Sequence, residues 1–103
     1  MYKIIFYVPE GDLEKVKSAL FEAGAGRIGD YSHCAWQVLG DGQFMPLEGS
    51  QPHLGSWQQL ETVREYKVEL VCETRLLDDA LTALKKAHPY ETPAYQVIRC
   101  EDL

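Results

Sequence analysis

The chain has 103 residues, of which 46% are hydrophobic and 25% are charged, so we expect a single globular domain spanning residues 1–103. Its formal net charge is −6 and its ten basic residues are scattered, which argues against nucleic acid and anionic membrane surfaces as partners, because clustered Lys and Arg bind both. No uncharged run is long enough to cross a bilayer and the first residues do not form a signal peptide, so a cytoplasmic location is expected.

The first quarter of the chain predicts a strand followed by a helix. Hydrophobic residues alternate from Tyr2 to Val8, which is the pattern of a strand. From Asp12 to Ala23 they recur at helical spacing, with Asp12 as a candidate N-cap and Gly24 as the residue that ends the helix.

The glycine-rich segment Gly24–Gly29 matches the letters G-x-G-x-x-G of dinucleotide-binding proteins. That motif binds phosphate because its glycines come after a strand and lead into the N-terminus of a helix. Here the glycines come after a helix and lead toward a strand, so the helix would present the wrong end of its dipole. We therefore expect this segment to form a tight turn and not a nucleotide site.

The middle of the chain holds two predicted strands with a long irregular segment between them. The strands run from about His33 to Leu39 and from about Val63 to Glu73. Between them, Gly40–Ser56 is rich in glycine and proline and is expected to form a loop or a loose hairpin. Its larger apolar and aromatic side chains are Phe44, Met45, Leu47, His53 and Leu54. Such a segment either packs on a neighbouring subunit or contacts a ligand, and the residues leave both open.

The last third of the chain predicts a helix, about Leu77–His88, and a strand, about Tyr95–Cys100. The order is then strand, helix, strand, strand, helix, strand. Two such split units make a four-stranded antiparallel sheet with both helices on one face. We therefore predict an α+β, ferredoxin-like βαββαβ sandwich with an extended hairpin or loop between its second and third strands.

The corner between the second helix and the last strand places His88, Tyr90 and Glu91 among two prolines that stiffen the backbone. One interpretation is a small site in which His88 and Glu91 bind a divalent metal ion, with Glu65 or Cys34 arriving from elsewhere. The other is a structural joint, in which His88 caps the last carbonyls of the helix and Tyr90 packs on the sheet.

Both faces of the predicted sheet carry apolar side chains. Ile5, Tyr7, Val71 and Ile98 lie opposite the fuller apolar sets, on the face that a monomer of this fold exposes to water. Burying four such side chains would contribute roughly 1.5–3 kcal/mol each. We therefore expect a closed homo-oligomer.

The three cysteines, Cys34, Cys72 and Cys100, are widely spaced and lie in strand-like segments. Their odd number and the absence of a Cys-x-x-Cys pair argue against a disulfide framework. A free cysteine in a strand behaves as a small hydrophobic residue. We expect all three to be buried and inert.

Four parts of the chain carry a family resemblance when they are taken together. They are Gly24–Tyr31 with Cys34 and Trp36, Gly40–Pro46, Pro52 with Gly55, and His88–Tyr95. In these parts the chain resembles the YqfO-type domain, which occurs alone and as an insert in the larger Nif-three-like di-metal proteins. The closing His-Pro-Tyr-Glu-x-Pro is also similar to the CutA family, the divalent-cation tolerance proteins related to PII signal proteins.

The resemblance implies a PII/CutA-like fold and, by analogy with those families, a trimer whose sheets face inward. It implies no activity, because the di-metal ligands of the Nif-three-like proteins lie in flanking halves that this sequence does not contain. Fold analogy alone carries no function.

We therefore expect a small, cytoplasmic, non-enzymatic oligomer that binds a divalent metal ion or a small ligand. The metal ligands would be His88 and Glu91, and the ligand or interface loop would contribute Phe44, Pro46, His53, Gly55 and Tyr90. Two alternatives stay open. The chain is an accessory or partner-dependent domain of a di-metal hydrolase, or it is a protein-interaction module that docks through residues 40–57.

Overall fold

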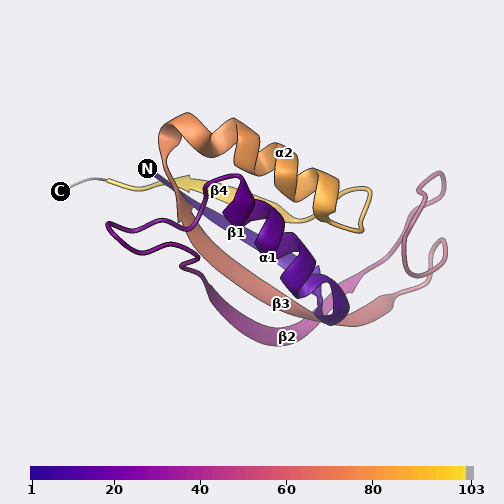
Figure 1. Ribbon diagram of the computed structural model, residues 1–103. Helices are drawn as coiled ribbons and strands as arrows, with labels where there is room; N and C mark the ends of the chain where they lie inside the picture. The colour runs from indigo at the N-terminus through magenta and orange to yellow at the C-terminus, as the bar shows by residue number, and fades with distance from the viewer. Residues whose placement is uncertain (102–103) are drawn as a thin grey trace.

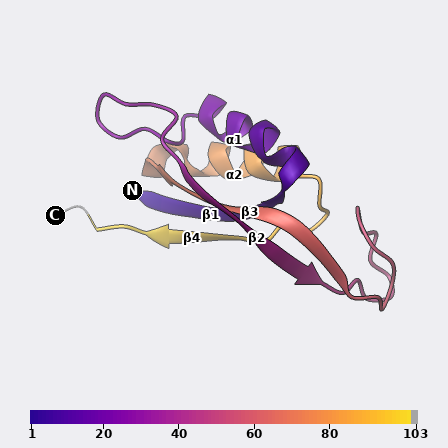
Figure 2. The ribbon, with the colours of Figure 1, turned by 90° about the horizontal axis from the view of Figure 1, so that it is seen from below.

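Four strands form one antiparallel sheet in the computed structural model, which describes residues 1–101, and both helices cover one face of that sheet (Figures 1 and 2). The elements are β1 (Tyr2–Pro9), α1 (Leu13–Glu22), β2 (Trp36–Phe44), β3 (Glu61–Cys72), α2 (Leu77–Ala87) and β4 (Tyr95–Arg99), with short 3-10 turns at Glu10–Asp12 and Thr74–Leu76. The strand order is β2-β3-β1-β4 and each pairing is antiparallel. The predicted ferredoxin-like βαββαβ fold is confirmed.

The core lies between the sheet and the two helices. Ile4, Phe6 and Val8 alternate along the central strand β1, so all three side chains point toward the helices and are fully buried. Leu20 of α1 and Leu84 of α2 meet them from the helical side. Both helices are short and amphipathic, and within residues 1–101 no helix has the length and apolarity that a membrane span requires.

The second strand is shifted along the chain relative to its prediction. The sequence indicates His33–Leu39, whereas β2 runs from Trp36 to Phe44. His33 has a φ of 58°, which interrupts the extended backbone before the strand begins. At the other end, Gly40 and Gly42 remain in the strand because their backbones pair with β3. The backbone pairing with β3 therefore keeps both glycines in the strand, although neither has a side chain to pack.

The glycine-rich segment after α1 forms a tight turn, as predicted. Gly24 has a φ of 99° and Gly26 a φ of 83°, both in the left-handed region that glycine enters freely. The N–H of Gly26 donates to the carbonyl of Val71 at 2.7 Å, and its carbonyl accepts from the N–H of Cys34 at 2.8 Å. These two bonds fasten the turn to the end of β3.

Replacing Gly26 by alanine should destabilise the fold by at least about 2 kcal/mol, because backbone strain and overpacking act together. A Cβ there would lie 2.8 Å from the ring of Phe21 and 3.0 Å from the carbonyl oxygen of Cys34. Gly29→Ala is the matched control, since Gly29 also has a positive φ but nothing lies within 4 Å of its Cβ position. Urea unfolding should show a loss of only about 1 kcal/mol for Gly29→Ala. Equal losses would contradict the close approach.

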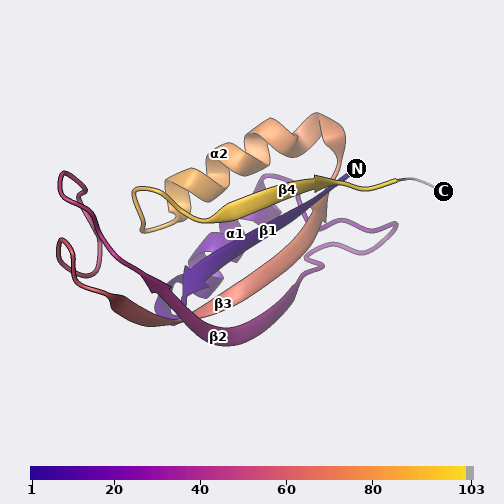
Figure 3. The same cartoon turned by 180° about the vertical axis from the view of Figure 1, so that it is seen from behind.

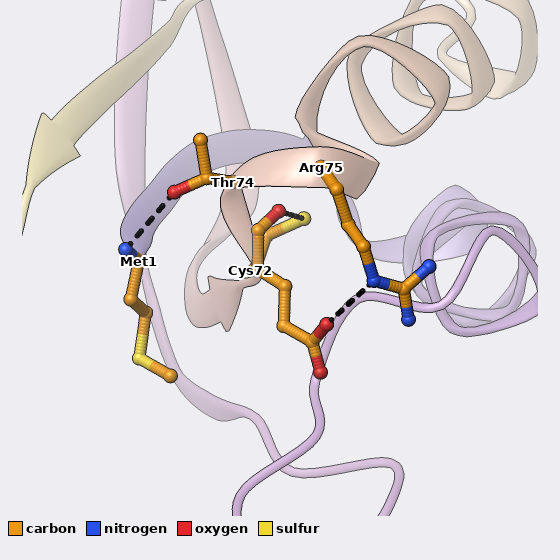
Figure 4. Close-up of polar contacts among 5 residues, drawn as sticks. Met1, Cys72, Thr74 and Arg75 are labelled. Atoms are coloured by element: carbon orange, nitrogen blue, oxygen red, sulfur yellow. Dashed lines mark hydrogen bonds and ion pairs between the residues drawn. The ribbon is translucent and has the colours of Figure 1, made fainter.

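Polar contacts tie the end of β3 to the start of the chain (Figure 4). The amino group of Met1 donates to Oγ1 of Thr74 at 3.1 Å, and Nε of Arg75 donates to Oε2 of Glu73 at 3.1 Å. The N–H of Cys100 donates to the carbonyl of Met1 at 3.0 Å. Residues 1 and 100 therefore lie side by side, at the end of the sheet where Figure 1 places both chain ends.

The expectation that every cysteine is buried is right for one and wrong for two. Cys72 is 1% exposed, and its thiol donates to the carbonyl of Glu73 at 3.4 Å. Cys34 and Cys100 are only half-buried. They lie just outside β2 and β4, so neither is held on the buried face of the sheet.

The sheet face opposite the helices is uncovered, as Figure 3 shows from behind. We call it the open face. Of the four apolar residues predicted there, Ile98 is 48% exposed, Tyr7 and Val71 are half-buried, and Ile5 is only 8% exposed. Ile5 lies on the central strand and is shielded by the strands on both sides, so its predicted exposure is wrong.

Two further apolar residues extend the open face onto the edge strand β2. Trp36 pairs with Glu69, and Val38 pairs with Lys67, which places both side chains on the same face as Ile5. Trp36 is 57% exposed and Val38 is 45% exposed. The exposed apolar surface therefore lies mainly on the outer strands, and only its centre is shielded.

Candidate ligand-binding site

His88 marks the point where α2 ends, and three hydrogen bonds hold it there. Its backbone N–H donates to the carbonyl of Leu84 at 2.9 Å, closing the last turn. Its ring Nε2 lies 2.7 Å from the carbonyl oxygen of Tyr7 in β1, and its Nδ1 accepts from the backbone N–H of Tyr90 at 3.1 Å. Pro89 disfavours helical geometry for the residue before it, and His88 accordingly has a ψ of 137°.

These contacts fix the protonation state of the His88 ring. Because Nδ1 accepts a hydrogen bond, the proton of the neutral imidazole sits on Nε2 and is donated to the Tyr7 carbonyl. Burial lowers the pKa of His88 below its ordinary value of 6.5, and the bond to Tyr7 offsets part of that effect. The geometry therefore supports the structural interpretation, in which a neutral His88 braces the helix exit against the sheet.

The two predicted metal ligands are already engaged in hydrogen bonds. Both ring nitrogens of His88 are in use, and Oε1 of Glu91 accepts from the backbone N–H of Gln51 at 2.9 Å. Cys34 lies elsewhere, in a depression beside Trp36. Within residues 1–101 no group of three or more His, Cys, Asp or Glu side chains is arranged to hold a metal ion. Metal binding at His88 and Glu91 stays a prediction, and it would require His88 to give up one bond.

The connection between β2 and β3, residues 45–60, is anchored to the segment that follows α2. We call residues 45–60 the hairpin loop and residues 88–94, which follow α2, the corner. The bond from Gln51 to Glu91 joins the two. Inside the loop, the indole N–H of Trp57 donates to the carbonyl of Ser50 at 2.8 Å. The loop and the corner both lie at the end of the molecule away from the chain termini (Figure 1).

The hairpin loop, the corner and the ends of β1, β2 and β3 together form a cavity of about 240 Å³. Its lining includes Tyr7, Phe44, Pro46, His53, Tyr90 and Glu91. Five of these six are among the residues singled out from the sequence. Segments far apart in the chain thus converge on one small cavity.

Two other predicted residues lie outside the cavity wall. His88 lies behind it, with its ring centroid 5.1 Å from that of Tyr90. Gly55 has a φ of 88°, and its Cβ position lies 3.5 Å from Cγ of Pro46. Gly55 therefore forms a turn of the hairpin loop beside Pro46.

Tyr90 is the central side chain of the site. Its ring centroid lies 5.7 Å from that of Phe44 and 6.1 Å from that of His53, so three aromatic rings cluster at the cavity. Its hydroxyl oxygen is buried and has no hydrogen-bond partner among the described residues. Burial raises the pKa of Tyr90, and the negative charge of Glu65 adds to that rise. An unpaired buried hydroxyl costs about 1–3 kcal/mol, so a group that reached it would gain a bond.

Glu65, which the sequence offered as a candidate partner for His88 and Glu91, lines the wall, and so does Tyr7, which the sequence did not indicate as a site residue. Burial raises the pKa of Glu65 above its ordinary value. Gly42 lies directly against this side chain, so that a Cβ at Gly42 would overlap the Glu65 carboxylate. Gly42 is the signal that could have been noticed, since glycine in a strand often marks the close approach of another group.

Comparison with known proteins finds clear relatives, although no protein-family model matches the chain. A Mycobacterium tuberculosis (strain ATCC 25618 / H37Rv) protein described as a GTP cyclohydrolase 1 type 2 homolog is 48% identical over 95 residues. A Bacillus subtilis (strain 168) protein of the same description is 42% identical over 99 residues. A solved structure of a Bacillus cereus protein related to NIF3 superposes with a TM-score of 0.84 at 39% identity and covers 98% of this chain.

The chain is similar to one part of these longer proteins, which include the protein related to NIF3. The match covers 92% of the chain against the mycobacterial protein and 96% against the Bacillus subtilis one, so the resemblance found from the motifs is confirmed. The chain spans only about a quarter of the length of these curated relatives, 25% and 26% respectively. Their description as cyclohydrolase homologs therefore belongs to much longer proteins.

Solved CutA structures share the fold of this chain at lower identity. The periplasmic divalent cation tolerance protein CutA from Archaeoglobus fulgidus superposes with a TM-score of 0.69 at 19% identity. The match covers 99% of this chain and 86% of that one. The expected CutA-like architecture is confirmed, and at this identity the likeness extends to the fold alone.

Proposed function

We propose that this chain is a non-enzymatic, oligomeric, cytoplasmic module that binds a small ligand in the cavity between the hairpin loop and the corner. The observation that carries the proposal is the convergence of Phe44, His53, Tyr90 and Glu91 on one cavity. Binding sites in proteins are typically concave and mostly apolar, with a few polar groups that fix orientation. Three clustered rings beside an unpaired hydroxyl and a carboxylate have that composition.

The fixed hydrogen bonds of the corner support a binding role over a catalytic one. His88 would be the natural general base of the corner, but both its ring nitrogens are occupied by backbone groups. It holds the wall of the cavity in place instead. A preorganised wall reduces the entropy lost when a ligand binds.

Replacing Phe44 by alanine should abolish most small-molecule binding at the cavity, because one of the three clustered rings is lost. The measurement is a nuclear magnetic resonance titration with a mixed set of aromatic amines, alcohols and acids. We expect wild-type shifts to concentrate at residues 44, 53 and 90–92 and affinity to fall about tenfold in Phe44→Ala. Leu60→Ala is the matched control, since Leu60 is exposed and lies outside the cavity. Shifts spread over the surface, or equal binding by Phe44→Ala, would contradict the proposal.

A divalent metal ion at His88 and Glu91 is the second candidate ligand, because the sequence of the corner contains an imidazole and a carboxylate, both of which are metal-ligand types. Titration calorimetry with zinc, copper, manganese and nickel separates the two candidates. Binding tighter than millimolar that disappears in a His88→Ala, Glu91→Ala double variant would support the metal. Binding that survives in this variant would place the metal elsewhere.

The oligomer that we propose is a trimer that buries the open face. The support is the exposed apolar surface on β2 and β4, where Trp36, Val38 and Ile98 are each about half exposed. The same surface could instead dock the remaining three quarters of a longer relative, in which case the domain would act as an accessory or interaction module.

A further inference from the structure

The described side chains that line the cavity carry negative charge and include no lysine or arginine. Glu65 and Glu91 each contribute a carboxylate. The formal net charge of the whole chain is −6. The potential inside the cavity is therefore negative, and an anionic ligand such as a nucleotide would be repelled.

The carboxylates of the cavity accept hydrogen bonds and cannot donate them. The lining also contains donors, among them Gln43, Ser50 and Thr92, but these are uncharged. Glu91 uses one of its oxygens for the N–H of Gln51, which leaves its second oxygen to accept another. The complementary ligand is one that donates several N–H bonds.

The aromatic walls suit the same kind of ligand. The Tyr90 ring centroid lies 5.7 Å from that of Phe44 and 6.1 Å from that of His53, and Tyr7 also lines the cavity. Tyr and Phe ring faces attract a cation within about 6 Å, most strongly where water is excluded. The chain makes such contacts elsewhere with its own side chains, as Lys85 over Tyr95 at 5.5 Å and Arg99 over Tyr2 at 5.4 Å. Within residues 1–101 no lysine or arginine does so at the cavity.

We propose that the cavity selects small organic cations, an alkylammonium or guanidinium group joined to a compact apolar body, with Glu65 as the main counter-charge and Tyr90 as an aromatic wall. This inference rests on the proposed ligand-binding function and narrows its ligand class. Glu65 holds the key position because Gly42 leaves room for its carboxylate against β2, where a larger residue would displace it. Glu91 contributes at the rim, where it is exposed.

Three isosteric probes test the charge preference: benzylammonium, benzyl alcohol and benzoate. Titrations followed by nuclear magnetic resonance at about pH 8 keep the Glu65 carboxylate ionised. We expect benzylammonium to bind about tenfold more tightly than benzyl alcohol, and benzoate more weakly than both. Equal or tighter binding of benzyl alcohol or benzoate at the cavity would overturn this inference and leave the proposed function standing. Failure of all three to bind would overturn both.

Two substitutions, which remove one negative charge each, test whether the preference for a cation arises at the cavity. Glu65→Gln should reduce the ratio of benzylammonium to benzyl alcohol affinity to within about twofold, while benzyl alcohol binding is kept. Glu48→Gln, in an exposed part of the hairpin loop outside the cavity wall, should keep the wild-type ratio. A ratio unchanged in Glu65→Gln, or lowered equally in both variants, would mean that net charge alone attracts the cation and would overturn the assignment.

Discussion

Replacing His88 by alanine should destabilise the fold by about 3 kcal/mol, because two buried backbone groups lose their partners at once. His88 is 5% exposed, and its ring bonds the carbonyl of Tyr7 in β1 and the N–H of Tyr90 in the corner. Urea unfolding measures the loss in free energy of unfolding. The protein concentration is held fixed, because association changes the apparent stability. His53→Ala is the matched control, since His53 is exposed and should cost less than about 0.5 kcal/mol.

The same substitution should also change how stability depends on pH. The pKa of His88 in the folded chain lies below its ordinary value of 6.5, so the unfolded chain takes up a proton at a higher pH than the folded chain does. The stability that His88 contributes is therefore complete above pH 6.5 and declines as the pH falls from there through the lowered pKa. The difference in unfolding free energy between wild type and His88→Ala should shrink over that range. A constant difference would show that folding does not change the pKa of His88, and a difference that grows on acidification would show that folding raises it; either result would contradict the buried, neutral ring.

Replacing Trp36 by glutamate should convert the proposed trimer into monomers. Trp36 is 57% exposed on the open face and pairs with Glu69, so a carboxylate there removes apolar contact and adds repulsion between like charges. The loss of about 2 kcal/mol of buried surface per subunit corresponds to an affinity about 30-fold weaker. Sedimentation velocity over a dilution series gives the measurement.

Leu47→Glu is the control for the association experiment. Leu47 is 68% exposed in the hairpin loop, away from the open face, and the substitution adds the same charge. It should leave the sedimentation behaviour unchanged. If wild type already sediments as a monomer at every concentration, the proposed trimer is wrong and the open face serves another partner.

The secondary structure could be predicted where periodicity and turn residues agreed. In β1 the alternation of Ile4, Phe6 and Val8 fixes the buried face, and Gly24 ends α1 as its left-handed φ requires. The error in β2 arose because Gly40 and Gly42 normally interrupt a strand. Here the long partner strand β3 supplies backbone bonds to both, so tertiary pairing outweighs the local preference.

The site was only partly predictable, because its members come from five separate segments. Phe44, His53 and Tyr90 could be named as aromatic residues in irregular segments, which is where ligands are commonly bound. Glu65 could be offered only as an alternative to Cys34, and Tyr7 could not be named, since each is one member of an alternating strand. Their place at the cavity depends on how far β2 and β3 continue past the end of β1, and that length is set by the register of the sheet.

The pairing of the first and last strands has an architectural consequence for larger proteins. Tyr2 lies opposite Arg99, and the carbonyl of Met1 receives the N–H of Cys100, so the polypeptide enters and leaves through neighbouring positions about 5 Å apart, the spacing of adjacent strands. A host protein could therefore carry such a unit spliced into a single surface turn without separating the two sides of that turn. The cavity would then lie at the tip farthest from the host, open to the surroundings.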